Sequence, residues 1–235
     1  MRSLKRAWWR WGALYGIGFV ILFIIGGVVQ GSTPSFDAPV EDIREYWVED
    51  GQQYLIGSYT LVLTFVLLWL PFISTLWSLL GYASAASEVW ARVGFAGGLA
   101  ALFFGSTASI FWGTLAWGNV AEQVSDDDLR LLMFLDVYAF TALEGIAFGI
   151  TLLGFSVAIL LSRSFWTWLG WFGVVIGALA LVSALSILSD DPEDSAFGFL
   201  GFIALIGLAL WIVATAVGMW MRGTPPESRR FVSEA

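Results

Sequence analysis

The chain has 235 residues, of which 58% are hydrophobic, 17% aromatic and 13% charged. Soluble globular domains average about 45–50% apolar and about 25% charged residues, so this composition is typical of a multi-pass membrane protein. The net charge of −8 argues against nucleic-acid binding, which needs clustered bases. The sequence contains no His and no Cys, which excludes histidine-ligated haem or zinc, iron–sulfur clusters and disulfides. We expect no cofactor.

Six stretches are apolar and long enough to cross a bilayer, which takes about 20 residues per helix. The predicted helices cover residues 12–29, 54–80, 92–117, 131–161, 165–188 and 196–221. A short polar tail follows at 222–235, and we expect it to be flexible. The sequence therefore predicts an all-α, polytopic membrane protein in which residues 1–235 form a single membrane domain.

A basic, aromatic segment, MRSLKRAWWRW, precedes the first predicted helix. The apolar run that follows is longer than the ~7–15 residues of a signal-peptide core. We expect an uncleaved first helix, with a cleaved signal peptide as the alternative.

The distribution of Lys and Arg predicts the orientation of the chain. Nine bases fall at one end of the predicted bundle: Arg2, Lys5, Arg6, Arg10, Arg92, Arg163, Arg222, Arg229 and Arg230. The other two, Arg44 and Arg130, fall in the opposite loops, together with most of the acids. By the positive-inside rule, we expect both termini in the cytoplasm and a location in the plasma membrane.

The longest outer loop, residues 30–53, contains a short amphipathic pattern. Val40, Ile43 and Trp47 share one helical face, with Pro39 at the start and Gly51 at the end. Either this helix is a lid over an external site, or its apolar side rests on lipid headgroups. We favour the interfacial helix.

Hydroxyl side chains follow one face of the second predicted helix, which also contains Pro71. Within a sector of about 100° lie Thr60, Thr64, Pro71, Ser74, Thr75 and Ser78. This stripe either lines a cavity or ion path, or serves interhelical hydrogen bonding and repairs the carbonyl that Pro71 frees. We favour the second interpretation.

Three helix starts carry capping signals. Ser87 is expected to cap the third helix, and Ser125 with Asp128 has the spacing of a capping box. Asp191 and Pro192 are expected to begin the sixth helix. The acidic run at 126–128 fits a helix N-terminus, with a cation site as the alternative.

Pairs of glycines four residues apart occur in four predicted helices and allow backbones to approach closely. The pairs are Gly12/Gly16, Gly94/Gly98, Gly145/Gly149 and Gly173/Gly177. They fit a homo-oligomer or contacts with other membrane proteins in the lipid bilayer, and they fit a tight monomer equally well.

Asp136 and Glu144 are the only acids inside a predicted span. An ionisable group at the bilayer centre costs ~2.5–3.5 kcal/mol or more, which makes it a candidate functional site. We expect Asp136 near the outer interface, ionised by water. Eight α-helical residues place Glu144 ~12 Å deeper and about 80° around the helix, too far for a shared hydrogen bond.

Glu144 is predicted to share its side of the helix with Thr141, and Tyr138 lies above it. No predicted span has a base in its apolar interior to pair with it, so we expect the neutral form. One hypothesis is a proton- or cation-binding step that uses Asp136 as relay, with Thr64 and Thr75 beside the path. The favoured hypothesis is a neutral acid hydrogen-bonded to Ser or Thr of a neighbouring helix. We expect neither catalytic residues nor a metal site.

The segment GIAFGITLLGFSVAILLSRSFWTWLGWFGVVIGALALVSAL joins a small-residue helix, a Ser/Arg turn and a Trp–Gly restart. It resembles a family of small six-helix prokaryotic membrane proteins known as domain of unknown function 4386. Phe165-Trp166 stands where that family has a proline. The resemblance implies the six-helix fold and no particular activity.

Two functions from different classes remain. The favoured one is a non-enzymatic structural, accessory or regulatory membrane component. The alternative is a small proton- or cation-coupled transporter or channel that uses Glu144 at membrane depth.

Overall fold

The computed structural model describes residues 2–35, 38–189 and 195–222, and these contain only helices and their connections. Six helical stretches are long and apolar enough to span a membrane, which confirms the predicted fold class. They cover Trp9–Gln30, Gly51–Gly81, Ala85–Leu115, Asp126–Ser162, Thr167–Leu188 and Ala196–Met221. The predicted tail beyond residue 222 lies outside the described residues.

Several spans consist of more than one helical segment. The segments are α1 (Arg2–Gln30), α2 (Val40–Glu49), α3 (Gly51–Thr64), η1 (Phe65–Trp69), α4 (Leu70–Gly81), α5 (Ala85–Leu115), α6 (Val120–Gln123), α7 (Asp126–Val137), η2 (Tyr138–Glu144), α8 (Gly145–Ser162), α9 (Thr167–Ser183), η3 (Ala184–Leu188) and α10 (Ala196–Arg222). Two of them, η1 and η2, are π-helices, and η3 is a 3₁₀-helix. The basic segment before the first span is helical and continuous with it.

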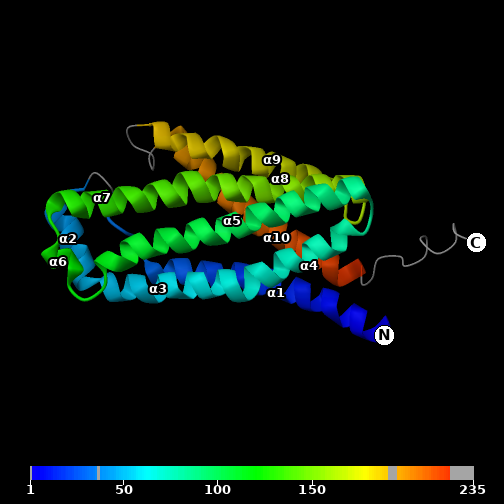
Figure 1. Cartoon of the computed structure of the whole chain (residues 1–235), viewed down its shortest axis with the longest axis horizontal. Helices are drawn as coiled ribbons and strands as arrows, with labels where there is room; N and C mark the ends of the chain where they lie inside the picture. Colours follow the sequence, from blue (N-terminus) through cyan, green and yellow to red (C-terminus); the bar gives the residue numbers. More distant parts are fainter. Residues whose placement is uncertain (1, 36–37, 190–194, 223–235) are drawn as a thin grey trace, which may run out of the picture.

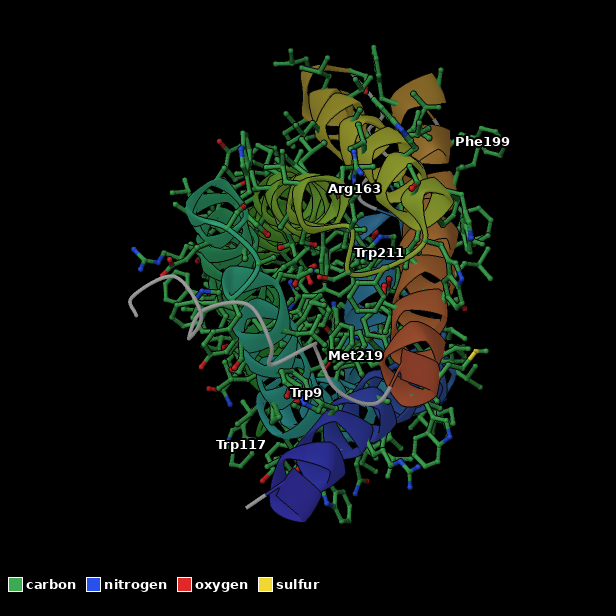
Figure 2. The ribbon with its side chains drawn as sticks, turned by 90° about the vertical axis from the view of Figure 1, so that its right-hand side faces the viewer. Trp9, Trp117, Arg163, Phe199, Trp211 and Met219 are labelled. Carbon is green, nitrogen blue, oxygen red and sulfur yellow. The ribbon has the colours of Figure 1, made fainter. Side chains whose placement is uncertain are left out.

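The six spans form a closed ring in chain order. Each packs against the next, and α10 returns to α1 (Figure 1). The view from the end shows the ring filled by side chains, with Trp211 turned inward and Phe199 outward (Figure 2). Accordingly, Trp211 is fully buried and Phe199 is 64% exposed, as expected for a bundle whose outer surface faces lipid.

The spans differ in length, which divides the bundle into two ends. The second, third and fourth spans have 31, 31 and 37 residues, against 22, 22 and 26 for the others. At 1.5 Å per residue the longest exceed a bilayer core of about 30 Å by 15 Å or more. Their extra turns meet α2 and α6 at the end opposite the start of α1 and the end of α10 (Figure 1). We call this the capped end and the other the terminal end.

The capped end has its own hydrophobic core, built by α2, α3, α5, α6 and α7. Its buried members are Ile43, Trp47, Tyr54, Trp112, Leu115, Ala121, Leu129, Met133 and Val137. Ile43 and Trp47 are at most 2% exposed. The interfacial-helix interpretation of α2 is therefore wrong, because its apolar face packs on protein instead of headgroups.

Two arginines hold α2 in place. Arg44 donates to the carbonyls of Ala121 and Val124, the latter at 3.2 Å, and pairs with Asp126 at 2.7 Å. From α7, Arg130 donates to the carbonyl of Ala38 at 3.3 Å. The two bases that the sequence places at this end thus both connect the α2 segment to α6 and α7.

Of the three predicted helix caps, one is found at the expected residue, one is wrong and one lies outside the described residues. Half of the predicted capping box is present: the Asp128 amide donates to the Ser125 hydroxyl at 3.2 Å, while the Asp128 carboxylate accepts from that hydroxyl at 2.7 Å. The prediction for Ser87 is wrong, because Ser84 caps α5 and the buried Ser87 hydroxyl donates to the carbonyls of Leu80 and Ala158. The predicted cap at Asp191 lies outside the described residues.

Glycines of the pairs spaced four residues apart lie at contacts between helices of the same chain. A Cβ on Gly154 would collide with the backbone of Gly94, so α8 and α5 meet backbone to backbone. A Cβ on Gly149 would lie 3.0 Å from the carbonyl oxygen of Gly177, so α8 also packs closely against α9. These stripes therefore explain a tight monomer without a second chain.

Candidate functional site

Glu144 is the last residue of η2 and faces the interior of the ring. Its side chain is 3% exposed. The carboxyl group lies against Gly105 of α5, where a Cβ would be 2.7 Å from Oε1 and 3.0 Å from Cδ. The missing side chain at Gly105 therefore makes room for the Glu144 carboxyl between the two helices.

One oxygen of this carboxyl is unsatisfied. Oε2 is buried, and within the described ranges it has no hydrogen-bond partner. The hypothesis that Ser or Thr of a neighbouring helix satisfies it therefore fails for this oxygen. A buried, unpaired ionised carboxylate is strongly unfavourable, so Glu144 must be neutral or hold a cation.

The helices around η2 supply no countercharge. It packs against α5, α8 and η3, and α8 and η3 contain no ionisable residue. The base of α5, Arg92, is 13 residues from Gly105, or about 20 Å along the helix. Of the described bases, none is therefore placed to pair with Glu144.

A π-helix turns Asp136 and Glu144 to the same side. The 80° separation predicted for a regular α-helix is wrong, because a π turn contains one more residue. Because of the extra residue in η2, the eight residues from Asp136 to Glu144 turn the helix as far as seven residues of a regular α-helix would. The two side chains therefore point in directions that differ by only about 20° around the helix axis. Asp136 is accordingly buried at 7% exposure, so the expectation of a water-exposed Asp136 is wrong as well.

Asp136 lies next to a polar cluster that the sequence interpretation missed. It is within electrostatic reach of both the Tyr54 hydroxyl and the Glu144 carboxyl. The Tyr54 hydroxyl is in hydrogen-bonding contact with Ser58 and Gln30, and Gln30 Nε2 donates to Ser58 Oγ at 3.1 Å. A Tyr and a Ser four residues apart, hence on one helical face, was the available signal.

The remaining predicted residues on this helix do not join the acids. Tyr138 is 41% exposed and stacks near Phe134, while Thr141 is only half-buried. In a π-helix they turn away from the face of Asp136 and Glu144. The structure therefore reduces the predicted group on this helix to the two acids.

The hydroxyl stripe of the second span bonds within its own helix. Thr64 Oγ1 donates to the carbonyl of Thr60 at 2.7 Å, and Thr75 Oγ1 to that of Pro71 at 2.7 Å. Thr60 and Ser74 bond in the same way. The favoured interpretation of interhelical bonding is wrong for these four hydroxyls. The chain instead accommodates Pro71 with the π turn of η1, in which the Leu70 amide donates to Phe65.

An aromatic cluster covers the acidic site at the capped end. Trp47 of α2 contacts Tyr54 and Trp112 edge to face, with centroids 5.0 and 5.5 Å apart. The indole nitrogens of Trp47 and Trp112 are buried without partners within the described part of the chain. At the rim of α2, burial and then the charge of Asp50 raise the pKa of the Tyr46 phenol, which therefore stays neutral.

The outer face of α2 borders a shallow groove of about 350 Å³. Its lining consists of Val40, Glu41, Arg44, Glu45, Val48, Glu49, Glu122 and Asp126. In the part of the chain that is described, no three acidic side chains are grouped as metal ligands. The acidic groove surrounds the Arg44 connection and is separate from the buried acids.

Comparison of the chain with known protein families, with curated proteins and with solved structures finds no match. The functional argument therefore depends on the geometry of the site.

Proposed function

We propose that the protein is a small proton- or cation-coupled transporter or channel whose ion-binding group is Glu144, and that it acts without covalent catalysis. One observation carries this proposal: a buried carboxyl, within electrostatic reach of a second acid, has one oxygen with no hydrogen-bond partner among the described residues. Intramembrane carboxyls with such surroundings are typical of ion and proton pathways.

We further propose that the capped end faces the exterior of the plasma membrane and that both termini are cytoplasmic. The support is the excess of bases at the terminal end, where seven of the described bases lie against two at the capped end. In this orientation the acidic site lies in the external half of the protein.

A second candidate function is a non-enzymatic accessory component that binds other membrane proteins or a second copy of itself. Its support is the close fit of the Glu144 carboxyl on Gly105, which can hold α5 and η2 together as a neutral contact. In this case the acid fixes the shape of the bundle and moves no ion.

Flux measurements distinguish these candidates. Purified protein in liposomes with an imposed proton or sodium gradient is compared with Glu144→Gln, which keeps the size and removes the charge. The control is Glu88→Gln, which changes a partly exposed acid near the terminal end. We expect flux in the wild type and the control and none in Glu144→Gln. Equal flux in all three contradicts the role of Glu144, and no flux with a co-purifying partner favours the accessory function.

A further inference from the structure

We propose that the ion bound by Glu144 is a proton, and that this proton exchanges with the capped end through Asp136 and the Tyr54–Ser58–Gln30 cluster. The inference rests on the proposed function and adds to it the identity of the ion and the side from which it enters.

The surroundings of Glu144 fit a proton better than a metal ion. Hard cations take six or more oxygen ligands. At Glu144 the facing position is Gly105, whose carbonyl already accepts from Ser109 at 3.1 Å, and Thr107 donates to Phe103 at 2.8 Å. A proton needs only one carboxyl oxygen, and Oε2 has no hydrogen-bond partner in the described part of the chain.

The next buried acid toward the capped end is Asp136, which lies about two turns from Glu144 on the same face and within electrostatic reach of the Tyr54 hydroxyl of α3. Hydroxyl groups both donate and accept, so they can pass a proton. The half-buried Gln30 at the end of α1 brings this cluster to the surface.

The opposite direction is closed by aromatic rings. Phe148, one turn beyond Glu144, lies with its centroid 6.1 Å from that of Phe65 and 5.8 Å from that of Trp69. Phe65 and Trp69 are at most 4% exposed. These rings place apolar surface between Glu144 and the terminal end, so in this conformation exchange is expected at the capped end.

Few charged groups influence this exchange. Along their own helix Asp136 and Glu144 act on each other, and from α3 only the Tyr54 phenol faces them. From α5, α8 and η3 no described ionisable group reaches their level.

Infrared spectroscopy of the purified full-length protein tests the route. The protonated carboxyl of Glu144 should give a C=O stretching band that disappears in Glu144→Gln. On transfer from H₂O to D₂O, the rate at which this band shifts measures exchange of the proton. Loss of one hydrogen-bonding relay should slow the exchange about tenfold or more in Asp136→Asn and in Tyr54→Phe.

Thr75→Val is the matched control. Because Thr75 lies in the terminal half, this substitution should leave the rate of proton exchange unchanged. Should Asp136→Asn not fold, Tyr54→Phe, which removes one oxygen, decides alone. Wild-type exchange rates in Tyr54→Phe and in folded Asp136→Asn overturn the route while leaving Glu144 as the ion site. Absence of a band that depends on Glu144 overturns the proposal that the bound ion is a proton. If flux is absent as well, the proposed function itself is overturned.

Discussion

The two ends of the bundle are built on different principles. Below Glu144, toward the terminal end, glycines bring α5, α8 and α9 into backbone contact and aromatic rings fill the interior. At the capped end, the interior contains two carboxyl groups, the Tyr54 phenol and two indoles, whereas the buried polar groups described in the terminal half are hydroxyls and indoles, such as those of Ser156 and Trp211. The first arrangement holds the helices at close range, whereas the second buries carboxyl groups, which are the costliest side chains to remove from water.

This difference assigns separate roles to the halves. In a lipid bilayer the hydrophobic effect does not drive helices together, so close van der Waals packing of small residues stabilises the association of the helices. With the bundle held in this way, the capped end can keep Glu144 and Asp136 buried despite their cost. Substitutions in the terminal half should therefore affect folding, and those in the capped half should affect exchange and local order.

The largest effect is expected where two backbones touch. Gly154→Ala places a methyl group onto the Gly94 backbone, which cannot move aside as a flexible side chain would. We expect a loss of about 3 kcal/mol or more in the free energy of unfolding, at the upper end of overpacking costs. Thermal unfolding in detergent measures it. Gly27→Ala is the control, because a Cβ there meets nothing within 4 Å, and equal stability of the two variants would contradict the backbone contact.

A smaller and reversible effect is expected at the acid. Gly105→Ala presses a methyl group on the Glu144 carboxyl and should cost about 1–3 kcal/mol. Glu144→Ala opens the space, so the double variant should be more stable than the sum of the single effects predicts. Unfolding free energies of the four proteins give the coupling. Strict additivity would mean that the two residues do not meet.

Loss of the Arg44 connection should loosen α2 alone. Arg44→Gln removes a charge and weakens bonds to two carbonyls and Asp126, each contributing about 1 kcal/mol. Hydrogen exchange of the α2 amides should accelerate about tenfold or more while the spans stay protected. Asp126→Asn serves as the comparison: it removes one exposed ion pair, with an expected effect of about 0.2–1 kcal/mol. Equal protection in Arg44→Gln and wild type would contradict a connecting role.

The sequence predicted the number of spans because hydropathy and length determine them without tertiary contacts. The relation between Asp136 and Glu144 could not be predicted, since one π turn changes the face of every residue after it. The partner of α2 could not be predicted either, because an amphipathic helix looks the same whether its apolar side meets lipid or protein. Tyr54 was missed because a tyrosine at the start of a span is typical of the membrane interface.

The smallest effect is expected at the hydroxyl stripe, which the sequence suggested as part of an ion path. Thr64→Val removes a hydroxyl that donates to a carbonyl of its own helix, and that carbonyl keeps the regular backbone bond of the helix. We expect a change below about 1 kcal/mol in unfolding free energy, since only one hydrogen bond is lost. Proton flux in liposomes should be unchanged, unlike in Glu144→Gln. A loss of flux in Thr64→Val with stability unchanged would place the hydroxyl stripe on the ion path up to the start of η1 and contradict this expectation.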